Sequence, residues 1–109
     1  MWIKMLKSFR LFVRLYFLII LILTSKTAFA SDPTKGGALY SIHCAGCHGS
    51  DGNNIMPNAP NFSQNEGLIK PDALLFDAIT KGGGAMPSYL GMLSNQDILD
   101  VIAFLRTLN

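Results

Sequence analysis

Two cysteines and a histidine stand together at residues 44 to 48, in the order Cys44-Ala45-Gly46-Cys47-His48. Two thiols at this spacing can form thioether bonds to the two vinyl groups on one edge of a porphyrin. An imidazole directly after them can then coordinate the iron through its neutral nitrogen. We therefore predict that this segment holds one covalently attached c-type haem, with His48 as its proximal ligand.

Other chemistries of a cysteine pair fit the sequence less well. A structural zinc ion needs four nitrogen or sulfur ligands, and these two cysteines are the only ones in the chain. The histidines, His43 and His48, flank the cysteines too closely for all four side chains to converge tetrahedrally. A thioredoxin-like dithiol requires a βαβ context that the sequence lacks, and a disulfide across so short a loop would leave the histidine unexplained.

The first thirty residues have the pattern of an export signal. Four basic residues come first, namely Lys4, Lys7, Arg10 and Arg14. An uninterrupted apolar run follows at 15–23, and the small residues of Ala28-Phe29-Ala30 predict cleavage after Ala30. We expect residues 1–30 to be removed as a signal peptide, and residues 31–109 to form one monohaem domain in the periplasm.

The apolar run is shorter than the roughly twenty residues that a membrane-spanning helix needs, because Arg14 interrupts it. After cleavage we therefore expect no membrane association. The alternative is an uncleaved segment that tethers the haem domain to the outer face of the membrane.

Removal of the first thirty residues would reverse the sign of the net charge. The whole chain carries nine basic and seven acidic residues, for a net charge of +2, but five basic residues precede residue 31 and all acidic ones follow it. The mature domain would carry −3 before the haem propionates are counted. This charge argues against a nucleic-acid partner and favours redox proteins with basic docking surfaces.

Apolar spacing predicts three main helices and no strands in the mature domain, which is therefore expected to be all-α. The first two helices are expected at 33–42 and 71–81. The third begins with a capping box at Ser94 and carries an apolar stripe to the end of the chain. The segments 49–67 and 82–93 are rich in residues that favour turns, so we expect two long irregular loops.

This order of elements resembles the small class I c-type cytochromes of bacterial electron transport, over essentially the whole mature chain. The resemblance implies a cytochrome c fold, in which three main helices wrap around one covalently bound haem. It also implies that Gly36 lets the terminal helix cross the first helix closely, and that Tyr40 packs against Phe104 there. Tyr40 is accordingly expected to contribute to the haem-binding site.

The resemblance further implies that a methionine of the second loop binds the iron opposite the histidine. Met86 is the candidate, because three glycines before it would let the loop approach the porphyrin and a proline after it would stiffen the loop. Met56 and Met92 are alternatives, since each lies in or beside a loop. His43 or an open position on the iron are further alternatives.

An axial imidazole needs a partner for its other nitrogen, which fixes its orientation and basicity. In this family a proline carbonyl twelve residues after the histidine accepts that hydrogen bond. Pro60 stands at this distance from His48, and Phe62 replaces the family's leucine two residues later. Pro57 is the alternative acceptor.

The expected function is single-electron transfer between larger redox proteins by an exported, monomeric cytochrome. With His48 and Met86 both bound, the iron has no open position, so we expect an electron carrier and not an enzyme. One alternative is a dedicated electron-accepting subunit of a periplasmic dehydrogenase or oxidase complex. A small peroxidase or gas-binding haem protein would instead require the methionine bond to be absent or labile.

Overall fold

The computed structural model describes residues 1–24 and 30–109, and its regular structure is helical. In these ranges there is no β-strand, only isolated bridges between Gly83 and Met86 and between Leu90 and Leu93. The all-α prediction is therefore confirmed. The expected cleavage site at Ala28-Phe29-Ala30 lies mostly outside the described residues, and cleavage there stays a prediction.

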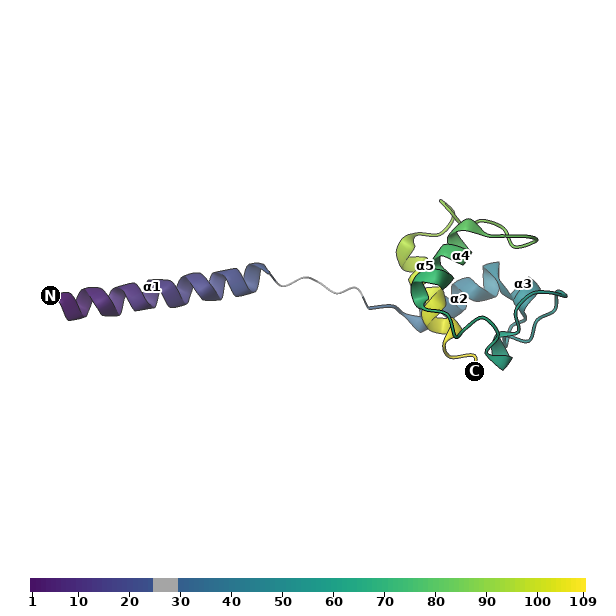
Figure 1. Cartoon of the computed structure of the whole chain (residues 1–109), viewed down its shortest axis with the longest axis horizontal. Helices are drawn as coiled ribbons and strands as arrows, with labels where there is room; N and C mark the ends of the chain where they lie inside the picture. Colours follow the sequence, from purple (N-terminus) through teal and green to yellow (C-terminus); the bar gives the residue numbers. More distant parts are fainter. Residues whose placement is uncertain (25–29) are drawn as a thin grey trace.

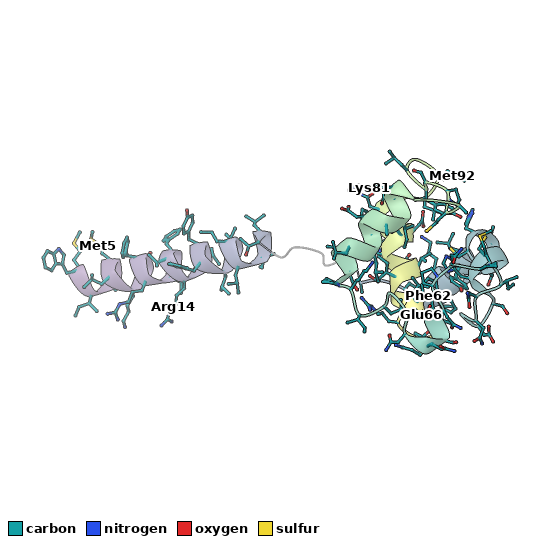
Figure 2. All side chains as sticks on the ribbon, turned by 45° about the vertical axis from the view of Figure 1, so that its right-hand side comes forward. Met5, Arg14, Phe62, Glu66, Lys81 and Met92 are labelled. Atoms are coloured by element: carbon teal, nitrogen blue, oxygen red, sulfur yellow. The ribbon has the colours of Figure 1, made fainter. Side chains whose placement is uncertain are left out.

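The N-terminal segment forms one helix, α1 (Trp2–Leu23), of which no residue is buried (Figure 1). Met5 and Arg14 project from opposite sides of this helix in Figure 2. Of the helices in the described ranges, none combines the length and the hydropathy that crossing a membrane requires.

The first helix of the domain, α2 (Pro33–His43), begins where the sequence predicts and extends one residue further. The carboxylate of Asp32 caps it by accepting hydrogen bonds from the N–H groups of Thr34 and Lys35, at 2.9 and 3.2 Å. This cap satisfies two of the amides that have no partner within the helix. The last turn of α2 leads directly into the Cys-x-x-Cys-His segment.

The terminal helix, α5 (Asn95–Leu105), has the predicted capping box between Ser94 and Asp97. The apolar stripe of the sequence continues beyond this helix, but the helix itself stops at Leu105. The amides of Thr107 and Leu108 instead donate to carbonyls three residues earlier, so the end of the chain tightens into turns.

Helices α2 and α5 cross closely and form the main helix pair of the domain (Figure 1). Gly36 permits this approach, because a Cβ atom there would lie 1.9 Å from the carbonyl oxygen of Asp100. The rings of Tyr40 and Phe104 pack beside this point with centroids 5.1 Å apart, which confirms the expected aromatic contact. The buried apolar residues are Tyr40, Phe62, Leu68, Leu75, Ile79, Tyr89, Leu93, Ile98, Val101, Ile102 and Leu105.

The remaining main helix, α4 (Asp72–Lys81), begins one residue later than predicted and packs against α5. Two short helices were not predicted, namely α3 (Ala45–His48) and the 3₁₀ helix η1 (Phe62–Gln64). The prediction of a loop without regular structure at 49–67 is therefore wrong at η1. The turn forms there because the side chain of Phe62 is buried and its amide donates to the Gly52 carbonyl.

Candidate functional site

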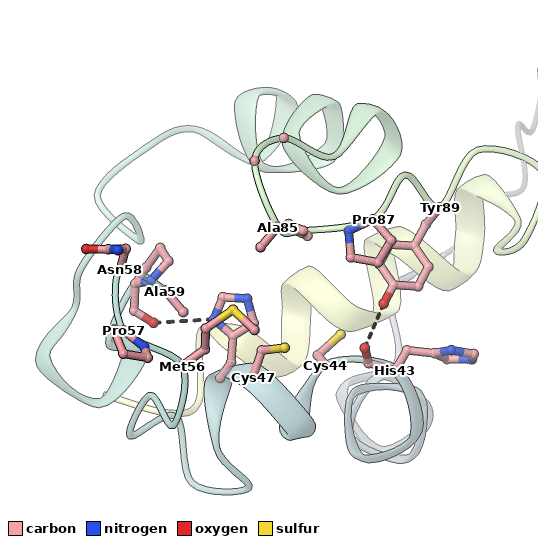
Figure 3. A pocket seen from close by; sticks show the side chains of 15 residues that line it. His43, Cys44, Cys47, Met56, Pro57, Asn58, Ala59, Ala85, Pro87 and Tyr89 are labelled. Atoms are coloured by element: carbon pink, nitrogen blue, oxygen red, sulfur yellow. Dashed lines mark hydrogen bonds between the residues drawn. The ribbon is translucent and has the colours of Figure 1, made fainter.

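The Cys-x-x-Cys-His segment is wound into a single helical turn at the end of α2. The amide of Cys44 donates to the Tyr40 carbonyl at 2.8 Å, which continues α2 by one bond, and the amide of His48 donates to the Cys44 carbonyl at 3.0 Å. This turn brings Cys44, Cys47 and His48 to the same cavity, whose volume is about 440 Å³ (Figure 3). A cavity of this size lies in the range of small-molecule and cofactor sites.

The cavity has walls from three segments of the chain. His43, Cys44, Cys47 and His48 form one side, residues 56–60 form the second, and residues 83–87 with Tyr89 form the third. In Figure 3, Ala85 and Pro87 lie across the cavity from Cys44 and Cys47. The thiols and the loop that carries Met86 therefore face each other.

The imidazole of His48 is held from two directions. Its Nδ1 atom lies 3.3 Å from the carbonyl oxygen of Pro60, which is the contact that the family resemblance implies. The ring also stacks on Phe62, with centroids 4.5 Å apart and an interplanar angle of 18°. His48 is buried, and with Nδ1 engaged its Nε2 atom remains as the nitrogen available to a metal.

Tyr40 supports the motif from behind and does not line the cavity. Its hydroxyl donates to the carbonyl oxygen of Gly49 at 2.6 Å, directly after His48 in the chain. Burial raises the pKa of Tyr40 to about 12, with smaller effects of Cys44 and Asp51, so the hydroxyl keeps its proton and remains a donor. Tyr40 thus fixes the backbone behind the imidazole.

Met86 lies half-buried at the end of a tight turn on the third wall. Gly83 and Met86 exchange two backbone hydrogen bonds, each of 3.0 Å, which close this turn. Gly82 precedes it with φ of +66°, and a Cβ atom there would lie 2.6 Å from the Met86 carbonyl oxygen. The glycine is thus needed for both its left-handed backbone and its lack of a side chain.

The two alternative methionine ligands, Met56 and Met92, differ in position. Met56 also lines the cavity, but its amide donates to the Cys47 carbonyl at 3.0 Å, so its backbone is attached to the motif itself. Met92 is 65% exposed and lies outside the cavity lining. Figure 2 shows it at the outside of the domain.

Two further residues of the cavity lining, Pro57 and Tyr89, differ in their contacts. Pro57 lines the cavity without the contact to His48 that Pro60 makes. Tyr89 was not singled out from the sequence, yet it is buried in the third wall and its hydroxyl donates to the His43 carbonyl at 2.6 Å. No sequence pattern marks such a bond, because any residue can supply a backbone carbonyl.

The donor set fits a c-type haem. Both cysteines are free thiols. Burial, followed by the neighbouring Cys47, raises the pKa of Cys44 to about 11, so the Cys44 thiol is neutral before any thioether forms. The mainly apolar lining and the imidazole on the motif side suit a planar apolar macrocycle with a central metal.

Comparison with known proteins agrees with this geometry. The family profile described as cytochrome C oxidase, cbb3-type, subunit III, matches residues 31–105. Cytochrome c6 of Thermosynechococcus vestitus is 31% identical over 88 residues, which cover 78% of each chain. Cytochrome c6 of Synechocystis sp. is 36% identical over 80 residues, which cover 72% of this chain and 67% of the relative. Cytochrome c6 of Porphyra purpurea is 33% identical over 79 residues, which cover 70% of this chain and 71% of the relative. The chain therefore belongs to this family of small monohaem c-type cytochromes, and it is an electron-transfer protein whose haem is attached covalently through two cysteines.

Proposed function

We propose that this protein is an exported cytochrome that carries one electron at a time between larger redox proteins, with its haem iron bound by His48 and Met86. The observation that carries the proposal is that Cys44, Cys47, His48 and Met86 all line the same cavity. Bound haem supplies the one-electron chemistry, since its iron changes between the ferric and ferrous states.

The surroundings of His48 support a role as a fixed proximal ligand. The Pro60 carbonyl accepts the Nδ1 proton and Phe62 stacks on the ring, so the imidazole is restrained both in tautomer and in rotation. An imidazole restrained in this way keeps the same position in both oxidation states, which suits rapid electron transfer.

The choice of Met86 over Met56 rests on which wall each residue belongs to. An axial ligand opposite His48 must come from the other side of the porphyrin plane. The Met56 amide is bonded to the Cys47 carbonyl on the motif side, whereas the Met86 turn lies on the wall that faces the thiols. A thioether in this position is a soft neutral donor that favours ferrous iron and raises the reduction potential.

Filling of both axial positions argues for a carrier and against an enzyme. Peroxidase chemistry and gas binding each need a vacant or labile position on the iron. The turn that holds Met86 is closed by two hydrogen bonds, and the position before it, Gly82, has a backbone and a space that only glycine fits.

An absorption measurement tests the ligand assignment. Ferric haem with a bound methionine has a weak far-red band, which we expect in the wild-type protein and in Met56→Ala but not in Met86→Ala. Met56→Ala is the matched control because both methionines line the cavity. Loss of the band in Met56→Ala with retention in Met86→Ala would transfer the role to Met56. A wild-type protein without the band would refute histidine–methionine ligation.

The N-terminal segment supports export to the periplasm. Its basic residues, apolar run and small residues before Ser31 match a cleaved signal, and the remaining domain would carry a charge of −3. Such a surface suits weak, salt-sensitive docking to redox partners with basic surfaces. The mass of the exported protein should correspond to residues 31–109 plus one haem, and retention of residues 1–30 would instead indicate a tether.

A second candidate is a dedicated subunit of a larger redox enzyme. The description of the matching family profile, which names an oxidase subunit, favours it. The two functions differ in the lifetime of the complex. A free carrier should separate from membranes and from larger enzymes at moderate salt, whereas a subunit should co-purify with one enzyme across salt concentrations.

A further inference from the structure

The hydroxyl of Tyr89 joins two walls of the haem cavity. It donates to the carbonyl oxygen of His43 at 2.6 Å, across 46 positions of the sequence (Figure 3). The rings of the two residues also meet edge to face, with centroids 5.8 Å apart. Only 5% of Tyr89 is exposed, and the hydrogen bond itself is partly buried.

The other hydrogen bonds of the Met86 loop lead elsewhere. The amide of Tyr89 donates to the Ile79 carbonyl at 3.2 Å, and the hydroxyl of Ser88 donates to the Thr80 carbonyl at 2.7 Å. Both bonds attach the loop to α4. Within residues 30–109, the Tyr89 hydroxyl makes the one hydrogen bond between segment 83–93 and the side of the cavity that carries the thiols.

We propose that Tyr89 is a positioning residue for the sixth iron ligand, because its hydroxyl fastens the Met86 loop to the end of α2 across the cavity. The proposal rests on the proposed function, in which Met86 binds the iron. The acceptor suits the role, since the last carbonyls of a helix have no partner within it and carry partial negative charge. Burial is the largest cause that raises the pKa of Tyr89, which keeps the hydroxyl a donor.

The Tyr89 hydroxyl thereby affects how well an external ligand competes with Met86 for the iron. With the hydroxyl in place, the loop spends most of its time with Met86 against the haem. Without it, the loop opens more often and an external ligand can occupy the sixth position. A net hydrogen bond contributes enough free energy to change such an equilibrium roughly two- to tenfold.

Titration of the ferric holoprotein with imidazole measures this competition. Tyr89→Phe retains the ring contact with His43 and loses only the hydroxyl, and we expect its affinity for imidazole to rise roughly two- to tenfold. Ser88→Ala is the matched control, because it removes a hydrogen bond of the same loop that leads to α4. Its affinity should stay within twofold of the wild type. Equal affinity in Tyr89→Phe and wild type, or an equal rise in both variants, would overturn the proposal.

Two further measurements keep the proposal separate from the ligand assignment. Amide hydrogen exchange of Gly83 and Met86 should be faster in holo Tyr89→Phe than in holo Ser88→Ala, whichever group binds the iron. In the wild type, the Tyr89 hydroxyl proton should be visible by NMR as a slowly exchanging signal, and rapid exchange would overturn the proposal without any variant. Absence of the far-red band in the wild type would refute the proposed ligation, and with it the role of Tyr89 at the iron, whereas the exchange rates would still show whether the hydroxyl fastens the loop.

Discussion

Replacing Gly36 with alanine tests how strictly the fold depends on the close crossing of α2 and α5. A Cβ atom at residue 36 would lie 1.9 Å from the carbonyl oxygen of Asp100 and 2.9 Å from the amide nitrogen of Val101. Both neighbours are backbone atoms of a helix, so neither can rotate away. The helices would have to separate by more than about 1 Å to restore van der Waals distances.

The size of the effect follows from two opposing terms. Overpacking in a core costs about 1–3 kcal/mol, and an obstacle made of backbone places this change at the upper end. Alanine in place of glycine inside a helix stabilises the folded state by up to about 1 kcal/mol, because alanine has the better helix propensity. We therefore expect Gly36→Ala to lower the free energy of unfolding by about 2 kcal/mol, which is about 10 °C in Tm for a domain of this size.

Denaturant unfolding of the holoprotein, followed by helical circular dichroism, measures this difference. Two glycines serve as controls. The atoms nearest to a Cβ atom at Gly37 would be those of the Phe104 ring, at 3.0 Å, and a side chain can shift. A Cβ atom at Gly46 would meet nothing within 4 Å. If Gly36→Ala proves as stable as Gly46→Ala, the close crossing is not required and the reasoning fails.

Three further predictions concern the support of the motif, the response to acid and the end of α5. Tyr40→Phe leaves a buried carbonyl without its donor, and we expect it to lower the unfolding free energy by about 1–2 kcal/mol in the same assay. A hydrogen bond from Lys35 is the largest cause that lowers the pKa of Asp97 from 3.8 to about 2. Because this folded pKa is below the unfolded one, the ionised carboxylate stabilises the fold above about pH 4. The free energy of unfolding should therefore fall as the pH drops toward about 2, and it should fall less steeply in Asp97→Asn. Arg106→Gln removes guanidinium hydrogen bonds to residues 68–72, and amide exchange in that segment should become faster.

Each of these predictions has a result that contradicts it. Unchanged stability of Tyr40→Phe would mean that water or another donor replaces the hydroxyl. Identical acid unfolding of the wild type and Asp97→Asn would show that Asp97 does not contribute to the pH dependence. Equal acceleration of exchange in residues 73–81 of α4 and in residues 68–72 of Arg106→Gln would indicate general loosening instead of a local contact.

The helices could be predicted because the interactions that start and stop them are local. Asp32 and Ser94 each cap a helix through amides within three residues, so a short stretch of sequence contains the whole signal. The predicted start of α2 is correct for this reason, and that of α4 is correct to within one residue because Pro71, which favours a helix start, marks it without a side-chain cap. The 3₁₀ turn at Phe62 was missed, because it depends on burial of a ring against Tyr40 and His48, which lie elsewhere in the sequence.

The site could be predicted where its residues keep a fixed spacing. The two cysteines and His48 form one helical turn, and the Pro60 carbonyl lies at Nδ1 of His48 as the resemblance implies. The sequence and the resemblance favour Met86 over Met56, although both lie in loops beside a proline. The structure adds one argument that the sequence does not contain, since the Met56 amide donates to the Cys47 carbonyl.

Polar partners far apart in the sequence were the least predictable part. Asp100 is only 2% exposed, although an aspartate on a helix usually faces solvent. It accepts hydrogen bonds from the Asp32 amide and the Gln96 side chain, both at 2.9 Å, and lies 3.5 Å from the Lys35 ammonium. Two of these three partners come from the other end of the domain, where no periodicity of α5 could reveal them.

The terminal helix α5 supports two walls of the haem cavity without lining the cavity itself. No residue of α5 is among those that line the cavity, yet α5 packs against both α2 and α4. The first of these helices ends in the motif that contains His48, and the second leads into the loop that contains Met86. The separation of the two proposed ligands is therefore set by how closely each helix approaches α5, and the Tyr89 hydroxyl connects the same two walls directly. A change at Gly36 and the loss of the Tyr89 hydroxyl act on one distance, so their effects on imidazole affinity should not be additive.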